Sequence, residues 1–351
     1  MGRGEMSRYA VLILPSANRV YADAAIALTQ AELGAFNQSV LGGRIGAIAT
    51  ECIGGVPYVS FECDDIGDRD ISFLANLSSL YALFAVEDEL LRPVTARGLD
   101  RLDDDLITIQ KYSGKTNEQF TKLLLNVTVL ASDFASGMLN RSLTVLDPLC
   151  GRGTTLNQAL MYGWNAYGIE IDERDVDAYA VFIQRWVKEK RLKHRVEYGP
   201  VRRDRRVVAR RLELSFAARK DDYRAGIVQR LDVVNADTSS LPEFFRPASV
   251  DLVVMDAPYG VQHGSRTKGR ELSRSPLELI ADNAPAWARV LRPGGAVGIA
   301  WNTHVARRDD AAEALESAGL RVVEPGAQVG FSHRVDQAIQ RDIIIARKAR
   351  D

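Results

Sequence analysis

VLDPLCGRGTT, residues 145–155, and DAPYG, residues 256–260, are the two stretches from which the fold of this chain can be inferred. Each stretch follows a short run of aliphatic and β-branched residues, which is typical of a tight loop leaving the carboxyl end of a buried parallel strand. Open α/β sheets bind their ligands at that edge. The two stretches therefore predict one loop that holds a cofactor and another that holds the group on which the cofactor acts.

The composition of the chain is that of an ordinary globular protein. Of its 351 residues, 46% are hydrophobic and 26% are charged, and the length allows two domains with separate cores. The net charge of −1 gives no general attraction to polyanions, so a nucleic-acid surface has to be local. Three cysteines without a CxxC spacing favour a reducing cytoplasm and argue against structural zinc. No apolar run reaches about 18 residues, and the first residues lack a signal-type apolar core, so a cytoplasmic location without membrane association is expected.

Residues 7–94 are predicted to form a small α+β domain with the element order β-α-β-β-α-β. This order is the split βαβ, or ferredoxin-like, pattern. Alternating or helically spaced apolar residues give the expected elements, which are strand 9–14, helix 21–36, strands 45–52 and 58–61, helix 71–86 and strand 89–94. Residues 95–105 turn polar and acidic and are the predicted linker.

The remaining residues, 106–351, are predicted to form the second domain. A strand is expected at 106–111, and Thr116 is expected to cap the helix that follows. The polar turn YSGKTNEQF, residues 112–120, is rich in hydrogen-bonding groups. It can serve as a plain helix cap, or it can close over the cofactor from outside the sheet.

The first loop has the features of a cofactor cradle without phosphate chemistry. An acid ends the strand, and two glycines allow close approach or a positive φ, but neither a phosphate-binding loop nor a dinucleotide fingerprint is present. Glu170 ends the next strand, where an acid can hold two ribose hydroxyls, and Asp237 follows a third strand, where it can accept from an adenine amino group. A ribose and an adenine without phosphates point to S-adenosylmethionine. The predicted cofactor-binding residues are Asp147, Pro148, Cys150, Gly151, Gly153, Thr154, Glu170 and Asp237.

The second loop suits chemistry on an amine of a nucleobase. Such an amine is a poor nucleophile because its lone pair is delocalised into the ring. The Asp256 carboxylate and the Ala257 carbonyl can each accept an N–H and draw the amine toward a sulfonium methyl group, while Tyr259 offers a stacking face. The predicted catalytic residues are Asp256, Ala257, Pro258 and Tyr259, and no metal is required. The following residues, 262–273, are predicted to form a flap over an extruded base.

DAPYG resembles the motif of the amino-group methyltransferases, which reads Asp or Asn, Pro, Pro and an aromatic residue. Within that group the chain is most similar to the tRNA guanine-N2 methyltransferases, in which a ferredoxin-like domain and a THUMP domain precede the catalytic domain. The likeness spans 106–348 and is carried by GKTNEQFTKLLLN, DPLCGRGTT, GIEID, DAPYG and FSHRVDQAIQRDIIIARK. It implies an α/β fold, with a Rossmann-like seven-stranded S-adenosylmethionine-dependent methyltransferase domain preceded by a small ferredoxin-like α+β domain.

The resemblance also implies residue roles, and the chain departs from it at two points. Asp147, Gly151, Glu170 and Asp237 would bind the cofactor, while Asp256, Pro258 and Tyr259 would engage the target base. The first motif proline is Ala257, which keeps the backbone carbonyl but lacks the ring that restricts φ. The segment before the linker is too short for a full THUMP domain, on which the family relies to grip the acceptor end of tRNA.

An insertion at about 191–230 concentrates positive charge between the second and third strands of the predicted sheet. Residues 185–230 hold 16 Lys and Arg against 6 Asp and Glu, which is a net charge of +10. A basic hairpin is expected here. It can neutralise phosphates of a nucleic acid, form a solvated charged face, or pair with the acidic remainder of the chain. The predicted substrate-binding residues are Arg202, Arg203, Arg205, Arg206, Arg210 and Arg211.

Together these patterns predict an N-methyltransferase that acts on an exocyclic amine of a nucleobase. Guanine N2 in tRNA or other RNA is the expected target, with RNA favoured over DNA as the partner. Two alternatives stay open. One is methylation of adenine N6 or cytosine N4 in DNA. The other is a binding protein that keeps the cofactor fold but has lost turnover through Ala257.

Overall fold

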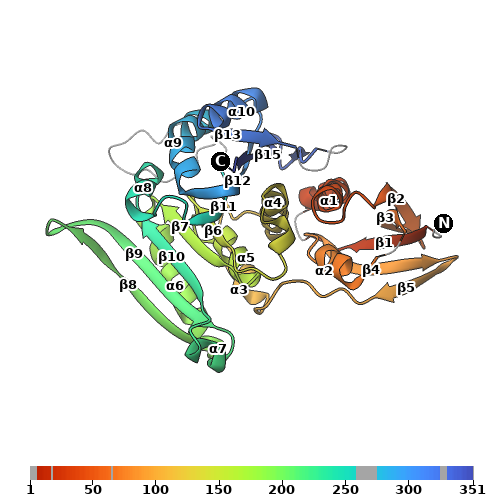
Figure 1. Cartoon of the computed structure of the whole chain (residues 1–351), viewed down its shortest axis with the longest axis horizontal. Coiled ribbons are helices and arrows are strands. Elements are labelled where there is room, and N and C mark those ends of the chain that lie inside the picture. Colours follow the sequence, from red (N-terminus) through yellow and green to blue (C-terminus); the bar gives the residue numbers. More distant parts are fainter. Residues whose placement is uncertain (1–5, 17–18, 65, 258–274, 325–329, 351) are drawn as a thin grey trace.

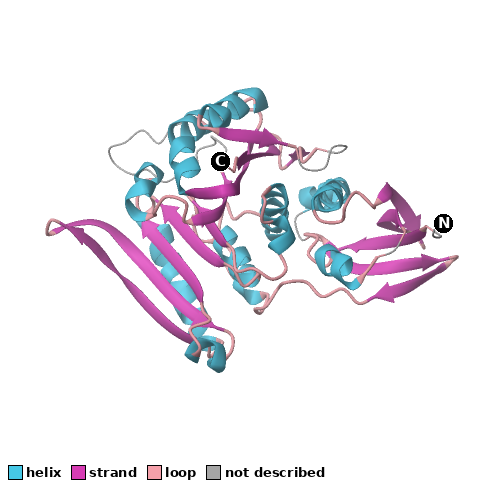
Figure 2. Ribbon diagram, in the orientation of Figure 1, coloured by secondary structure: helices cyan, strands magenta, loops and turns pink. Residues whose placement is uncertain are grey.

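The computed structural model describes residues 6–16, 19–64, 66–257, 275–324 and 330–350 (Figure 1). The strands form two separate sheets, a small antiparallel one near the N-terminus and a large mixed one. Figure 2 shows helices packed beside the large sheet and, at one edge of that sheet, a long hairpin. Within the described residues, no helix is both long and apolar enough to cross a membrane.

The small sheet has the order β2-β3-β1-β4-β5, and all neighbouring strands are antiparallel. The element order through β4 is β-α-β-β-α-β, as the sequence predicts, and β5 adds a fifth strand at the edge. The elements are β1 (Ser7–Ile13), α1 (Arg19–Ser39), β2 (Gly46–Ile53), β3 (Val56–Cys63), α2 (Asp68–Leu74), β4 (Leu80–Glu87) and β5 (Leu90–Val94).

The predicted helix at 71–86 is wrong beyond its first turn. The helix α2 ends at Leu74, and the next apolar residues belong to β4, where Leu83 and Ala85 are buried and Tyr81 is 65% exposed. Apolar residues in this stretch fit both the helical period and the alternation of a half-buried strand. Pairing of β4 with β1 on one side and with β5 on the other decides between the two periods.

The large sheet runs β13-β15-β12-β11-β6-β7-β10-β9-β8, and β14 pairs with β15. The strands from β13 to β10 are the predicted seven-stranded methyltransferase sheet. The strands are β6 (Thr144–Asp147), β7 (Asn165–Glu170), β8 (Lys193–Arg203), β9 (Arg206–Ala217), β10 (Gln229–Asn235), β11 (Val250–Asp256), β12 (Leu291–Asn302), β13 (Leu320–Val323), β14 (His333–Arg334) and β15 (Gln340–Lys348).

Three helices of this part of the chain, α3, α4 and η1, precede the first strand of the large sheet, and the others lie between its strands. The predicted strand at 106–111 is wrong, because a single helical turn, α3, occupies 106–108 and no strand is formed at 109–111. The helices are α3 (Asp105–Thr108), α4 (Glu118–Ala131), η1 (Ala135–Gly137), α5 (Thr154–Met161), α6 (Glu173–Glu189), α7 (Lys220–Arg224), η2 (Thr238–Ser240), α8 (Leu241–Phe244), α9 (Pro276–Val290) and α10 (Arg308–Ser317).

The basic insertion extends the sheet instead of forming a separate body. Strand β9 pairs antiparallel with β10, and the last pair joins Arg210 to Asn235. The paired residues 201–209 continue past the carboxyl end of β10, so the tip of the β8–β9 hairpin projects beyond the edge at which parallel strands deliver their loops. At about 3.3 Å per residue, the overhang is about 13 Å.

A buried polar network joins the two sheets where α1 and α4 pack together (Figure 1). Glu32 of α1 is fully buried, and its carboxylate accepts hydrogen bonds from Ser78 and, at 2.7 Å, from the side-chain amide of Asn126 on α4. Tyr162 then donates to the Asn126 oxygen at 2.8 Å. Burial raises the pKa of Glu32. Because each polar group here has a partner, the network fixes the position of α4 against α1.

Backbone hydrogen bonding between β11 and β12 continues for one residue beyond the end of β11. The Ala257 N–H donates to the Ala300 carbonyl of β12 at 2.8 Å, and both residues are buried. A proline at position 257 has no N–H to make this bond. The alanine that departs from the motif of the resemblance therefore makes a backbone hydrogen bond at the start of the predicted catalytic loop.

We expect Ala257→Pro to destabilise the protein, although it restores the motif. The substitution removes the donor to a buried carbonyl, which costs about 1–3 kcal/mol. Ala257→Gly keeps the N–H and is the matched control, with an expected loss of about 1 kcal/mol or less. Denaturant titration measures the free energy of unfolding. A proline variant as stable as the original chain would contradict this role for Ala257.

Candidate functional site

Four acidic residues line up along one edge of the large sheet. Strands β11, β6, β7 and β10 are parallel neighbours, so their carboxyl ends lie side by side. Asp256 ends β11, Asp147 ends β6 and Glu170 ends β7, while Asp237 follows β10. The structure thus brings the predicted cofactor residues Asp147, Glu170 and Asp237 to one edge and places Asp256, the first residue of the predicted catalytic loop, next to them.

Asp147 is a buried carboxylate whose charge is only partly compensated. It is 3% exposed, and one oxygen accepts the Leu149 N–H at 3.0 Å. Burial raises the pKa of Asp147 to about 7, and the nearby carboxylates of Glu170 and Asp256 act in the same direction. A carboxylate in these surroundings is ionised more readily when a cation binds beside it.

Glu170 ties the glycine loop to the end of β7. Its two oxygens accept the backbone N–H groups of Gly151 and Asp172, each at 2.8 Å. Gly151 has a φ of +49°, and the direction in which a Cβ would point is open, with no atom within 4 Å. This open direction beside a carboxylate fits the sugar of a nucleoside. Burial also raises the pKa of Glu170.

The second glycine of the loop serves packing. Gly153 has a φ of +80°, and a Cβ there would lie 2.5 Å from the ring of Tyr179 on α6. Pro148 and Cys150 lie between Asp147 and the first glycine, and a Cβ added at Gly168 would meet the Cys150 sulfur at 2.7 Å. The loop is therefore pressed onto β7 and α6 at these points.

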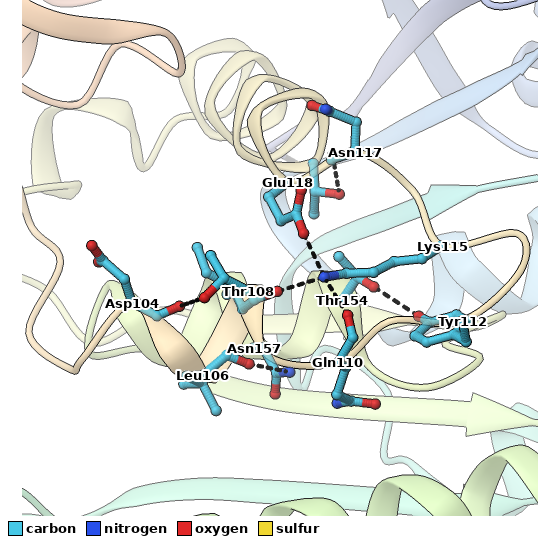
Figure 3. Close-up of polar contacts among 12 residues, drawn as sticks. Asp104, Leu106, Thr108, Gln110, Tyr112, Lys115, Asn117, Glu118, Thr154 and Asn157 are labelled. Atoms are coloured by element: carbon cyan, nitrogen blue, oxygen red, sulfur yellow. Dashed lines mark hydrogen bonds and ion pairs between the residues drawn. The ribbon is translucent and has the colours of Figure 1, made fainter. Parts of the chain in front are cut away.

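The segment between α3 and α4 is hydrogen-bonded to the predicted cofactor loop (Figure 3). Tyr112 and Thr154 share a hydrogen bond of 3.0 Å between their hydroxyl groups, and Asn157 of α5 donates to the Leu106 carbonyl. Lys115 is surrounded by acceptors, at 2.6 Å to the Ile107 carbonyl and 2.5 Å to Glu118. Of the two interpretations of this polar turn, helix capping is present, because Asn117 caps α4, while closure over a cofactor stays a prediction.

Asp256, the first residue of the predicted catalytic loop, is held by two distant segments. The Thr116 hydroxyl donates to Asp256 Oδ2 at 2.7 Å, and Arg341 of β15 approaches the same oxygen at 3.5 Å. The predicted capping role of Thr116 is wrong, because Asn117 caps α4 through the Phe120 N–H. Pro258, Tyr259 and the flap at 262–273 lie outside the described residues.

Asp237 stands at a turn, where its side chain accepts the Ser239 N–H at 2.9 Å and caps η2. The neighbouring Asn235 donates to the carbonyls of Glu170 and Ile171 at 3.0 and 3.1 Å. These bonds tie the ends of β7 and β10 together. The predicted adenine contact of Asp237 remains a prediction.

The six arginines of the insertion fall into two sets. Arg203 pairs with Glu243, Arg210 with Glu173 and Asp177, and Arg211 with Asp232. For these three arginines, the structure shows pairing with acidic residues elsewhere in the chain, which is one of the alternatives that the sequence left open. Arg202, Arg205 and Arg206 are exposed at the hairpin tip, and no carboxylate in the described part of the chain forms an ion pair with them.

The tip also has an unusual backbone. Asp204 and Arg205 connect β8 to β9 with φ angles of +47° and +63°. Two-residue hairpin turns of this kind favour asparagine and glycine, because residues with a Cβ resist positive φ. A long cation occupies one of these positions despite that preference, and strained residues of this kind gather at functional sites.

Sequence reasoning gave Arg341 no role and gave Thr116 the wrong one. Both lie in segments that carry the family resemblance, but neither forms a motif with Asp256 along the chain. Within the described residues, no group of three or more His, Cys, Asp or Glu side chains is placed to hold a metal ion.

A protein-family model described as "RMKL-like, methyltransferase domain" matches residues 124–296, just under half of the chain. No curated protein matches the chain. The 1,6-didemethyltoxoflavin-N1-methyltransferase of Burkholderia thailandensis is 16% identical over 63% of this chain and 77% of that chain, with a TM-score of 0.35. The precorrin-6y C5,15-methyltransferase of Geobacter metallireducens is 14% identical over 72% and 98%, with a TM-score of 0.39.

Likenesses this weak say nothing about mechanism or substrate. The family model, in contrast, spans β6 to β12 and so contains the glycine loop, Glu170 and Asp256. The strand order and the acidic strand ends agree with it. The chain is an S-adenosylmethionine-dependent methyltransferase.

Proposed function

We propose that this methyltransferase modifies an exocyclic amine of a nucleobase, with guanine N2 of tRNA or other RNA as its target. The observation that carries the proposal is the place of Asp256. Its carboxylate ends β11, directly beside the strand that delivers Asp147 and the glycine loop. An acceptor at this point can engage an amine that faces the cofactor.

Bound S-adenosylmethionine supplies an electrophilic methyl group on a sulfonium. Asp256 accepts an N–H of the amine and draws its lone pair out of conjugation with the ring. The nitrogen–carbon bond forms as the carbon–sulfur bond breaks, the bonding pair stays on sulfur, and the amine proton passes to Asp256 and then to water. Pro258 and Tyr259 are proposed to line the face of the base, as the resemblance implies.

We expect Asp256→Ala to lower kcat by at least about 10²-fold, because the acceptor that activates the amine is lost. The affinity for S-adenosylmethionine should change little, since Asp256 is not among the proposed cofactor residues. Transfer of a labelled methyl group to RNA measures the first quantity, and calorimetry measures the second. Unchanged turnover would reject the role of Asp256.

Nucleoside mass spectrometry of RNA and DNA from cells with and without the gene can identify the base that is methylated. Loss of an N2-methylated guanosine from tRNA is the expected result. Loss of N6-methyladenine or N4-methylcytosine from DNA instead would replace the proposed substrate and keep the amine chemistry.

The proposed cofactor site is formed by Asp147, Gly151, Glu170 and Asp237, with Pro148, Cys150, Gly153 and Thr154 shaping the loop. Asp147 gives this assignment a measurable property. Its pKa of about 7 means that much of it is protonated below neutral pH when no ligand is bound. The cationic sulfonium or ammonium group of the cofactor favours the ionised form, so binding releases this proton.

The affinity for S-adenosylmethionine should therefore rise between about pH 6 and about pH 8, by up to about tenfold per pH unit below the pKa of Asp147. Above that pKa the dependence levels off, because the carboxylate is already ionised. Asp147→Asn cannot ionise and should bind more weakly with a flatter pH profile. Calorimetry at several pH values compares the two, and equal slopes would contradict the assignment.

The hairpin tip is proposed to contact the phosphates of the RNA. Arg202, Arg205 and Arg206 project beyond the edge that holds the catalytic loop, so a strand that enters the site can pass along them. Their contacts would add affinity without reading sequence. The paired arginines Arg203, Arg210 and Arg211 are proposed to support the hairpin and to contribute less to binding.

Replacing Arg202, Arg205 and Arg206 by glutamine should weaken RNA binding and flatten its salt dependence, by about 0.7–0.9 in the logarithmic slope for each phosphate that is no longer neutralised. Arg211→Gln is the matched control, because its guanidinium is engaged by Asp232. It should leave the slope near that of the original chain. Binding titrations over a range of salt concentrations give these slopes, and an unaltered slope in the triple variant would favour a solvated charged face.

A further inference from the structure

Two side chains far apart in the sequence converge on one oxygen of Asp256. Thr116 lies 140 residues before it and Arg341 lies 85 residues after it, and both contact Oδ2. A carboxylate held at one oxygen from two directions cannot rotate freely about its Cβ–Cγ bond. The direction in which Asp256 presents its other oxygen is thereby fixed.

Arg341 is buried and packs against an aromatic ring. Its side chain is 6% exposed, and its guanidinium lies over the Phe120 ring of α4, 4.3 Å from the centroid. A planar guanidinium stacked in this way is pre-organised for a carboxylate. Buried ion pairs contribute little net stability compared with apolar packing. Stability alone therefore does not explain why a buried arginine lies beside the proposed catalytic carboxylate.

The stack continues into the N-terminal module, the part of the chain formed by β1 to β5 with α1 and α2. His333 lies opposite Arg341 across the β14–β15 pair, and its ring packs against Phe120 at 5.2 Å. Tyr21 of α1 meets the same histidine edge-on at 6.2 Å. Burial lowers the pKa of His333, so this ring adds no second positive charge beside Arg341.

We propose that Thr116 and Arg341 are positioning residues that aim the Asp256 carboxylate at the target amine, with α1 closing the aromatic layer behind them. The inference rests on the function proposed for Asp256. Arg341 also places a positive charge beside Asp256, whose strand is the neighbour of the strand that ends at Asp147. The N-terminal module then contributes to catalysis through packing, in addition to any contact with RNA.

Thr116 offers the sharper test, because its hydroxyl can be removed with little change in volume. Thr116→Val should lower kcat roughly 10-fold to 100-fold, the effect expected from a misplaced reacting group, with the KM for RNA and the Kd for S-adenosylmethionine nearly unchanged. Thr116→Ser keeps the hydroxyl and should recover most of the rate. A valine variant with full kcat, or a serine variant as slow as valine, would overturn the proposal.

Arg341 provides the second contact to Asp256, and it can be tested in the same way. Arg341→Met should lower kcat roughly 10-fold to 100-fold, because Thr116 alone then holds the carboxylate, with the KM for RNA and the Kd for S-adenosylmethionine nearly unchanged. Arg341→Lys keeps the charge and should recover part of the rate. A methionine variant with full kcat would contradict this role of Arg341.

Failure of this inference and failure of the proposed function give different results. If Asp256→Ala retains turnover, the proposed function fails, whatever the Thr116 variants do. If Asp256→Ala is inactive but Thr116→Val turns over normally, only the positioning role fails. Thermal unfolding of each variant separates a loss of kcat from a loss of folded protein, and the valine and serine pair remains informative should Arg341→Met fail to fold.

Discussion

Parallel pairing of β11, β6, β7 and β10 is the constraint on which the candidate site depends. Because these strands run in one direction, four loops leave at one edge, and each strand ends at or just before an acidic residue. Hydrogen bonds between the loops then hold the edge together. Glu170 accepts the Gly151 N–H, and Asn235 donates to the Glu170 carbonyl. Burial raises the pKa of Asp147, and the nearby carboxylates of Glu170 and Asp256 act in the same direction, so a cation bound at this edge favours the ionised form.

Much of the catalytic part of the fold was predictable, because its signals are local. A buried strand followed by a glycine loop, and a second strand followed by DAPYG, can each be recognised within about a dozen residues. The contacts to Asp256 could not be found this way. Thr116 and Arg341 reach it across 140 and 85 residues, and their own neighbours in sequence give no sign of a shared partner.

The errors in the prediction have a physical cause as well. The stretch 71–86 carries apolar residues that satisfy two periods at once, and only pairing with β1 and β5 shows that its second half is a strand. In residues 185–230, the sequence shows sixteen cations but not their partners. Carboxylates such as Asp177 on α6 and Asp232 on β10 take up part of that charge after folding.

The overhang of the β8–β9 hairpin has a consequence for the size of the substrate. The cations at its tip are set off from the strand ends by a fixed length of paired backbone, so the hairpin acts as a spacer of constant reach. A nucleotide alone can occupy the edge of the sheet without touching the tip. A longer strand can occupy both at once, and the two contacts then strengthen each other because they belong to one molecule. For the RNA substrate proposed above, the geometry of the hairpin separates recognition of a base from recognition of a polymer.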